Sequence, residues 1–494
     1  MTQSDQQPPP STADAGPDRR SRGRLRAGAI GGLSVGVMAA AFAAPSTSIF
    51  FNSPFVAANA GVAMTAAFIA SAIAIGFVAF NVAAFSSKLP TSGYAYTFVS
   101  HGLGTKAGFL AAWMTLLVFI SSPVILAPYF GLTVSALVQN MAGVQISWVI
   151  PALVLLAFVG TLAILGISDS LRVGGFFVVL ELLLVTAFGV YMLLKSPHGQ
   201  APAAFSPHSA PSLGGFAVAM IFGILSFQGF EGAATLGEET ANAKRRVPRA
   251  LIGAIVVLGI FYTFNAYAAT VGWGSNRLAG YSASASPFIT LAQHYAGSWL
   301  ADLLGTVVAV GLLAGTIASV NASARMLFAM GRNRVLPRAL SDVSSRTQTP
   351  IVASMVVVIG GGLAGVLAAF IWSPSEVWGY MGSIISLGAI VVYIMVSVGV
   401  IPFFRRQYRS EFSVIRHAIV PVIATAILLL PLLIKNGLLW PVPAYPFNLI
   451  PYLVLAWLAV GGGIVLYLQA KRPDDLSRAG RITVDDDSPV TSAR

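Results

Sequence analysis

Twelve long apolar runs decide what this chain can fold into. Each is about as long as, or longer than, the roughly 20 residues that an α-helix needs to cross the apolar part of a bilayer. Only 9% of the 494 residues are charged, too few to cover the surfaces of water-soluble domains of this total length. The sequence therefore predicts an all-α integral membrane protein with twelve transmembrane helices. These occupy approximately 27–50, 56–84, 104–136, 147–167, 172–194, 213–237, 249–273, 299–329, 350–371, 377–404, 415–434 and 446–470.

Residues 1–26 and 471–494 differ from the rest of the chain in composition. The first segment is rich in Gln, Pro, Ser and Arg, and the second contains a run of Asp. Such segments have too few apolar side chains to offset the entropy lost on folding, so we expect two disordered tails. The first apolar run starts near Ala27 and is longer than the apolar part of a signal peptide, so we expect it to stay in the membrane.

Basic residues are distributed unevenly over the predicted connections. An even number of spans puts both termini on one side, and that side holds 26 of the 29 Lys and Arg residues. The other side holds only Lys195, Arg277 and Lys435. Because cytosolic loops carry the excess of basic residues, we expect both termini to be cytosolic in a multi-pass protein of the cell membrane. The same distribution argues against nucleic-acid binding and favours contact with membrane lipid.

The sequence lacks the motifs of common enzyme sites. It contains no Cys, which excludes disulfides, Cys-based zinc sites and thiol nucleophiles. The five histidines form no pair at the i, i+4 spacing of a metal site, and no phosphate-binding loop is present. We therefore expect neither an enzyme nor a bound metal or cofactor.

Two of the predicted helices contain residues that interrupt a helix. Pro45 cannot donate a helical hydrogen bond and should free carbonyl groups near Ala41, while Gly229 and Gly232 flank Glu231 in the sixth run. Because these runs are five spans apart, they cross the membrane in opposite directions, and paired interruptions in an inverted repeat mark a transporter site. An ordinary proline kink and two packing glycines are the alternative. The predicted substrate-binding residues are Ala43, Ala44, Pro45, Ser46, Thr47, Phe227, Gly229, Phe230 and Gly232.

The sixth run and the loop after it resemble a signature of the amino acid–polyamine–organocation (APC) permeases. In that signature a Gly-Phe-Glu break is followed by a Glu and by an Ile/Val-Pro-Arg-Ala turn. Further similarities concern the loop after the second helix and the eighth helix with its loop. The matching residues are Gly229-Phe230-Glu231, Glu238-Glu239 and Arg246-Val247-Pro248-Arg249-Ala250, then Leu89-Pro90-Thr91-Ser92-Gly93-Tyr94-Ala95-Tyr96, and Asn321 to Pro337 with Thr349-Pro350.

The resemblance implies a LeuT-type fold, in which a 5+5 inverted repeat with broken helices 1 and 6 is followed by two more helices. The transport core would cover 27–404, and the additional helices would lie within 405–470. Many relatives have Gly-Ser-Gly at the first break, whose amides bind the substrate carboxylate. This chain has Ala44-Pro45-Ser46-Thr47 instead, so the resemblance alone does not imply a carboxylate site, although Ser46, Thr47 and Ser48 can still offer amides and hydroxyls.

Glu181 and Glu231 are the acidic residues inside the predicted spans, apart from Asp302 near a span end. An ionisable side chain at membrane depth is costly, so a functional role is the default interpretation. Glu181 is interpreted as the carrier of a coupling proton or as part of a cation site. The alternative is a protonated carboxyl that is hydrogen-bonded to a neighbouring helix. For Glu231 the resemblance implies gating or proton coupling, and a structural brace across the break is the alternative.

Three hydroxyl side chains of the eighth run, Thr316, Ser319 and Ser323, share one helix face. Together with carbonyl groups of the first run, such hydroxyls can bind Na⁺. Hydrogen bonds between helices are the alternative, and they are the commoner use of Ser and Thr in membranes.

These observations leave substrate identity, coupling ion, transport mode and oligomeric state open, and they rank three hypotheses. The first is a secondary active transporter of amino acids or related amines, which works by alternating access and is coupled to an H⁺ or Na⁺ gradient or to exchange. The second is a receptor derived from such a transporter, which binds the same ligand and signals through its termini. A membrane-embedded enzyme is the third, because no catalytic cluster is present.

Overall fold

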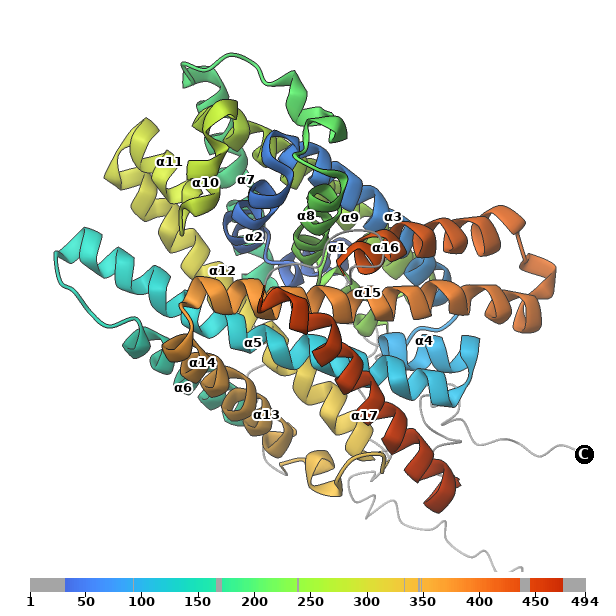
Figure 1. The fold of residues 1–494 in the computed structure, drawn as a ribbon. Coiled ribbons are helices and arrows are strands. Elements are labelled where there is room, and N and C mark those ends of the chain that lie inside the picture. The colour runs from blue at the N-terminus through green and yellow to red at the C-terminus, as the bar shows by residue number, and fades with distance from the viewer. Residues whose placement is uncertain are drawn as a thin grey trace, which may run out of the picture.

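The computed structural model describes residues 32–91, 93–165, 171–237, 240–332, 334–344, 347, 349–435 and 445–473. Every regular element within these ranges is helical (Figure 1). Residues 1–26, almost all of 471–494, and Glu238 and Glu239 lie outside them. The α-helices are α1 (Gly32–Phe42), α2 (Pro45–Ala60), α3 (Met64–Ser86), α4 (Tyr94–Leu103), α5 (Thr105–Ala142), α6 (Val149–Leu165), α7 (Leu171–Lys195), α8 (Leu213–Phe227), α9 (Ala243–Trp273), α10 (Leu278–Ala283), α11 (Pro287–Ala296), α12 (Ser298–Arg332), α13 (Ile351–Val357), α14 (Ala364–Ile371), α15 (Pro374–Gln407), α16 (Val420–Lys435) and α17 (Ile450–Lys471).

Short helices of other types join or interrupt the α-helices. Two of them, η8 (Val358–Leu363) and η10 (Ile415–Ile419), are π-helical, and they continue directly into α14 and α16. The 3₁₀-helices are η2 (Gly61–Ala63), η3 (Pro202–Phe205), η4 (Pro207–Ser209), η5 (Phe230–Leu236), η6 (Ser275–Arg277), η7 (Arg338–Ser341), η9 (Arg409–Glu411) and η11 (Phe447–Leu449).

Within the described ranges, nine helical segments are long and apolar enough to cross a membrane. Two shorter apolar helices, Val149–Leu165 and Ile415–Pro431, coincide with further predicted runs. The first of the nine segments, Val35–Ser86, contains the first two predicted runs together. The molecule is therefore a multi-pass membrane protein by the length and composition of its helices.

The end predicted for the first run is wrong. We expected this run to stop at residue 50, whereas α2 continues to Ala60. Asn52 and Ser53 lower the local hydropathy, but both side chains are buried and paired. Asn52 donates to Ser226 Oγ at 3.0 Å, and Ser53 Oγ lies 2.7 Å from the Tyr281 hydroxyl. Polar residues with such partners can continue a helix inside the bundle.

Three helices fall outside the predicted runs because they are too short or too polar to span a bilayer. The first, α4, packs against α5 and α15. The other two, α10 and α11, lie in the connection between α9 and α12 and contact α2. Phe288 of α11 stacks on Phe50 of α2 with ring centroids 4.6 Å apart, so this connection is packed onto α2.

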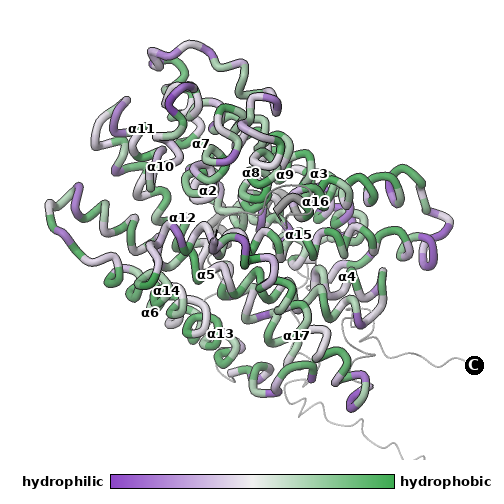
Figure 2. Tube along the Cα trace, viewed as in Figure 1, coloured by the Kyte–Doolittle hydropathy of each residue, from purple (hydrophilic) through white to green (hydrophobic). Residues whose placement is uncertain are grey.

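The core of the bundle is built around α1, α2, α8 and η5. The helices α3, α9 and α12 pack directly on these elements. Helices α6, α14 and α17 lie farther out against α5, and α13 lies against α12 and α6 (Figure 1). Hydrophobic residues run along the helices, and hydrophilic ones gather at the connections (Figure 2). Large apolar side chains on the outer helices are exposed, for example Phe176, Ile260 and Phe370. This is the surface that lipid requires.

One close helix contact yields a stability prediction. A Cβ at Gly365 of α14 would lie 2.7 Å from Val124 Cα of α5, whereas a Cβ at Gly360 would have no atom within 4 Å. We expect Gly365→Ala to destabilise the protein by about 1–3 kcal/mol, because the two backbones must separate. The matched variant Gly360→Ala should be neutral. Thermal unfolding in detergent measures both, and equal melting temperatures for the two variants would contradict this account of the packing.

Candidate functional site

The chain between α1 and α2 leaves the helical path at Ala43 and Ala44. Ala44 has φ 43° and ψ 69°, the left-handed conformation, and Pro45 begins the next helix. Proline suits this position because its missing N–H would have no helical partner there. The predicted free carbonyl near Ala41 is wrong, since Ala44 N donates to Ala41 O at 3.1 Å. Ala43 O also has a partner, because Ser48 Oγ donates to it at 2.8 Å.

A second departure from α-helical structure lies between α8 and η5. Gln228 ends α8 with ψ 137°, and Gly229 follows with φ 107°. The chain then continues as the 3₁₀-helix η5, in which Gly232 N donates to Gly229 O at 2.8 Å. A positive φ of this size suits glycine, which has no Cβ to clash with the backbone.

The two interruptions, at Ala43–Ala44 and at Gln228–Gly229, are in contact. A Cβ at Gly229 would overlap the Phe42 carbonyl group, whose carbon would be only 2.7 Å away. A Cβ at Gly232 would lie 2.6 Å from the Phe42 ring. Two segments almost 190 residues apart in sequence are thus packed backbone to backbone, and both glycines are needed for that approach.

Glu181 of α7 reaches the start of α2. Its side chain is 4% exposed, and its Oε1 accepts a hydrogen bond from the backbone N–H of Ser46. Ser46 lies in the first turn of α2, where amides lack helical partners and the helix dipole favours negative charge. The carboxyl is therefore bonded to a neighbouring helix, through the backbone of the predicted substrate site.

Two hydroxyls lie beside this carboxyl. Ser46 Oγ and Thr47 Oγ1 are buried and have no hydrogen-bond partner. A Cβ at Gly311 of α12 would lie 2.9 Å from Thr47 Oγ1 and 3.4 Å from Ser46 Oγ. The same atom would lie 3.8 Å from Glu181 Oε1. Three oxygens from α2 and α7 thus converge on one point of α12.

Glu231 stabilises the second interruption, at Gln228–Gly229, through hydrogen bonds. Its side chain is 3% exposed, and its Oε2 accepts from Gly229 N at 2.9 Å and from the Tyr393 hydroxyl at 3.2 Å. These bonds tie η5 to α15 and satisfy an amide that the interrupted helix leaves free. Gating or proton coupling by Glu231 stays a prediction.

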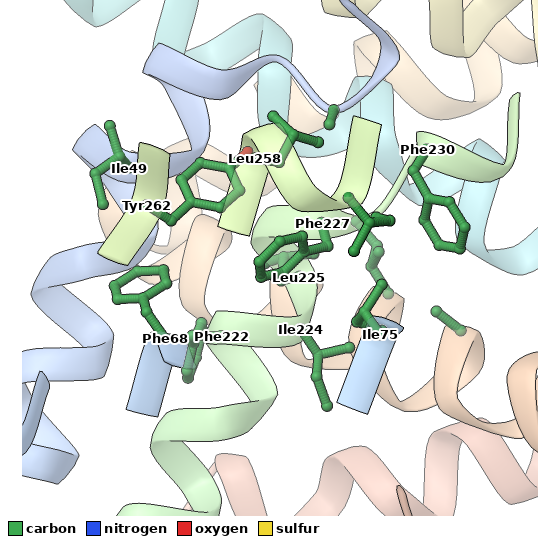
Figure 3. Packing of buried hydrophobic residues seen from close by; sticks show 14 of the residues in the cluster. Ile49, Phe68, Ile75, Phe222, Ile224, Leu225, Phe227, Phe230, Leu258 and Tyr262 are labelled. Carbon is green, nitrogen blue, oxygen red and sulfur yellow. The ribbon is translucent and has the colours of Figure 1, made fainter. Parts of the chain in front are cut away.

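Aromatic side chains surround both breaks. Phe227 meets Tyr262 of α9 edge to face, with centroids 5.0 Å apart, and both belong to the buried cluster in Figure 3. The Tyr262 hydroxyl donates to Ser226 O at 2.7 Å, near the end of α8. Phe230 is fully buried and lies 6.0 Å from the Tyr393 ring. Phe227 and Phe230 are therefore packed in the core beside the breaks.

The three hydroxyls predicted as a cation site all bond within their own helix. Thr316 Oγ1 donates to Leu312 O at 2.7 Å, Ser319 Oγ to Thr316 O at 3.0 Å, and Ser323 Oγ to Ser319 O at 2.7 Å. Their helix, α12, contacts both α1 and α2. A Na⁺ site at these residues stays a prediction.

Two residues of the site were not predicted from the sequence. Tyr393 is the partner of Glu231, and its only signal is a tyrosine inside an apolar run. Gly311 is the point on which the oxygens of Ser46, Thr47 and Glu181 converge, and it looks like any packing glycine of a membrane helix. Neither partnership can be deduced without the rotations of α12 and α15.

Comparison with known proteins agrees with this architecture. A family model described as amino acid permease matches residues 29–460. The branched-chain amino acid permease of Bacillus subtilis (strain 168) is 26% identical over 86% of this chain and 89% of its own length. The methylthioribose transporter of the same organism is 22% identical over 87% of this chain and 91% of its own length. The low-affinity putrescine importer of Escherichia coli (strain K12) is 26% identical over 69% of this chain and 73% of its own length. This chain therefore belongs to the amino acid permease family of the APC superfamily, and it is a multi-pass membrane permease rather than an enzyme.

Proposed function

We propose that this permease is a secondary active transporter of amino acids or related amines. One observation carries the proposal: the interruptions at Ala43–Ala44 and Gln228–Gly229 touch, and a buried carboxyl accepts from one backbone amide in or next to each of them. Interrupted helices that meet inside the bundle are the usual place for a transporter's substrate site. The relatives named above support amino acids and amines as the substrate class.

The proposed fold is the LeuT-type arrangement of twelve helices. Residues 27–404 would form the transport core of two inverted five-helix repeats, with α1–α2 and α8–η5 as its broken first and sixth helices. The segment 405–470 would add two helices. The uneven distribution of Lys and Arg supports cytosolic termini in the cell membrane.

The transport step is proposed to be alternating access around the two touching breaks. Half-helices on either side of a break can tilt separately, so that the site opens to one side of the membrane at a time. Phe227 and Phe230 lie next to the breaks and are suited to move with them. Glu181 is the proposed carrier of the coupling proton, because it is buried and contacts α2 directly.

Uptake by purified protein in liposomes tests the proposal. Radiolabelled amino acids and amines are offered with an imposed pH gradient, with an imposed Na⁺ gradient, and with neither. We expect saturable uptake that exceeds that of protein-free liposomes and that rises with the pH gradient. Specific ligand binding without flux under all three conditions would contradict a transporter and favour the receptor hypothesis.

A further inference from the structure

One amide at the start of α2 already binds a carboxyl group that belongs to the protein. A carboxylate of a substrate would seek the same N–H group, because a first-turn amide and the helix dipole favour an anion. Glu181 is bonded to the Ser46 N–H at this place. A second carboxylate would therefore have to displace Glu181 or lie beside it in a buried environment.

The neighbouring hydroxyls lack partners and can accept hydrogen bonds, as the Glu181 carboxyl can. Ser46 Oγ and Thr47 Oγ1 are buried without partners, although buried hydroxyls nearly always have one. Together with Glu181 Oε1, they converge over Gly311. A hydroxyl can donate as well as accept, whereas an ionised Glu181 carboxylate only accepts. An ammonium group has three donors, so it can donate to Glu181 and to both hydroxyls, whereas a substrate carboxylate could accept from the hydroxyls but has no donor for Glu181.

The charges of the buried side chains also favour a cationic substrate. Both Glu181 and Glu231 are buried, and among the described residues no Lys or Arg side chain is buried with them. In the described part of the chain, His417 is the one buried histidine. Its ring stacks on Phe404 with centroids 3.7 Å apart instead of facing Glu181 or Glu231. A buried carboxyl that is ionised needs a compensating positive charge, and when no proton neutralises it a cationic substrate supplies that charge.

We propose that this permease prefers organic amines to the amino acids that carry a carboxylate on the same skeleton, with Glu181 as the residue that sets the preference. This inference rests on the proposed function and narrows its substrate class. The amine would donate to Glu181 and to the hydroxyls of Ser46 and Thr47. The carboxylate of an amino acid would find its amide taken and would face like charge, which disfavours binding strongly.

Matched ligand pairs test the preference on the full-length protein. Leucine is compared with 3-methylbutylamine, and ornithine with 1,4-diaminobutane, by binding titration and by uptake into liposomes. We expect each amine to bind at least about 100-fold more tightly than its parent amino acid, the size expected for removing one like-charge contact at a buried site. Equal or tighter binding of the amino acids, with measurable uptake, would overturn the inference and leave the transporter proposal standing. If no ligand binds and none is taken up, both proposals fail.

Two variants separate the Glu181 charge from general effects. Glu181→Gln keeps an oxygen that accepts from the Ser46 N–H but removes the charge, so the preference for amines should fall at least about tenfold. Glu411→Gln removes a carboxylate from an exposed position and should leave the preference unchanged. A Glu181→Gln protein that folds, binds and keeps the full preference would show that Glu181 does not set it.

Discussion

Glu181→Gln is expected to abolish accumulation driven by a pH gradient while substrate counterflow at saturating concentration continues. The side-chain carboxyl of Glu181 is buried against the Ser46 N–H, and in the proposed function it takes up and releases the coupling proton. Gln is nearly isosteric and still accepts from that N–H, but it cannot carry a proton. For one coupled proton, the native protein should concentrate substrate about tenfold per pH unit, and the variant should only equilibrate it.

The measurement is uptake into liposomes with an imposed pH gradient, followed by counterflow in the same preparation. Glu411→Gln is the matched control, because Glu411 lies at an exposed position, where it pairs with Lys88. The control should accumulate substrate as the native protein does. Unchanged accumulation by Glu181→Gln would refute the assignment of the proton to this residue.

Gly229→Ala is expected to lower substrate affinity by at least about tenfold and to reduce stability by about 1–3 kcal/mol. The added methyl group would overlap the Phe42 carbonyl group, and φ 107° is strained for any residue with a Cβ. The two breaks must then move apart, which displaces the Ser46 and Glu231 regions from each other. Small displacements of this kind weaken a site that depends on convergent groups from several helices.

Gly76→Ala in α3 is the control for this prediction. A Cβ at Gly76 would have no atom within 4 Å, so the change should leave affinity unaltered and leave stability equal or slightly higher. Binding titrations and thermal unfolding give both quantities for each variant. Native affinity in a folded Gly229→Ala protein would mean that the contact between the breaks is not part of the binding site.

The long helices were predictable because the bilayer fixes their length and composition. Nine apolar helical segments of the described residues match predicted runs, and one of them covers the first two runs together. Ala44, just before Pro45, and Gly229 have positive φ, so the backbone leaves the α-helical path at both positions, while two broken helices of a transporter stay a prediction. Two hydrogen bonds that the sequence does not reveal caused the errors. Asn52 looks like the end of a span, but Ser226 satisfies it, and the carbonyl of Ala41 looks free but accepts from Ala44.

Contacts between helices that are distant in sequence could not be predicted from the sequence. The Phe42 carbonyl meets Gly229, and Ser46 meets Glu181, only because α1, α2, α7 and η5 pack together with particular rotations. A hydrophobic run carries no signal for rotation when its residues are apolar all round. The sequence therefore identified Glu181 as unusual, and the fold supplied its partner.

Access to Thr47 from the two sides of the membrane tests the central proposal most directly. The chain has no Cys, so Thr47→Cys introduces a single thiol in the first turn of α2, and Ala203→Cys gives an exposed control. Liposomes of known orientation are treated with a membrane-impermeant thiol reagent from the outside, or with the reagent trapped inside. We expect Thr47→Cys to react from either side and saturating substrate to block both reactions. Ala203→Cys should react from one side regardless of substrate. Reaction of Thr47→Cys from only one side, without protection by any transported ligand, would contradict alternating access at this site.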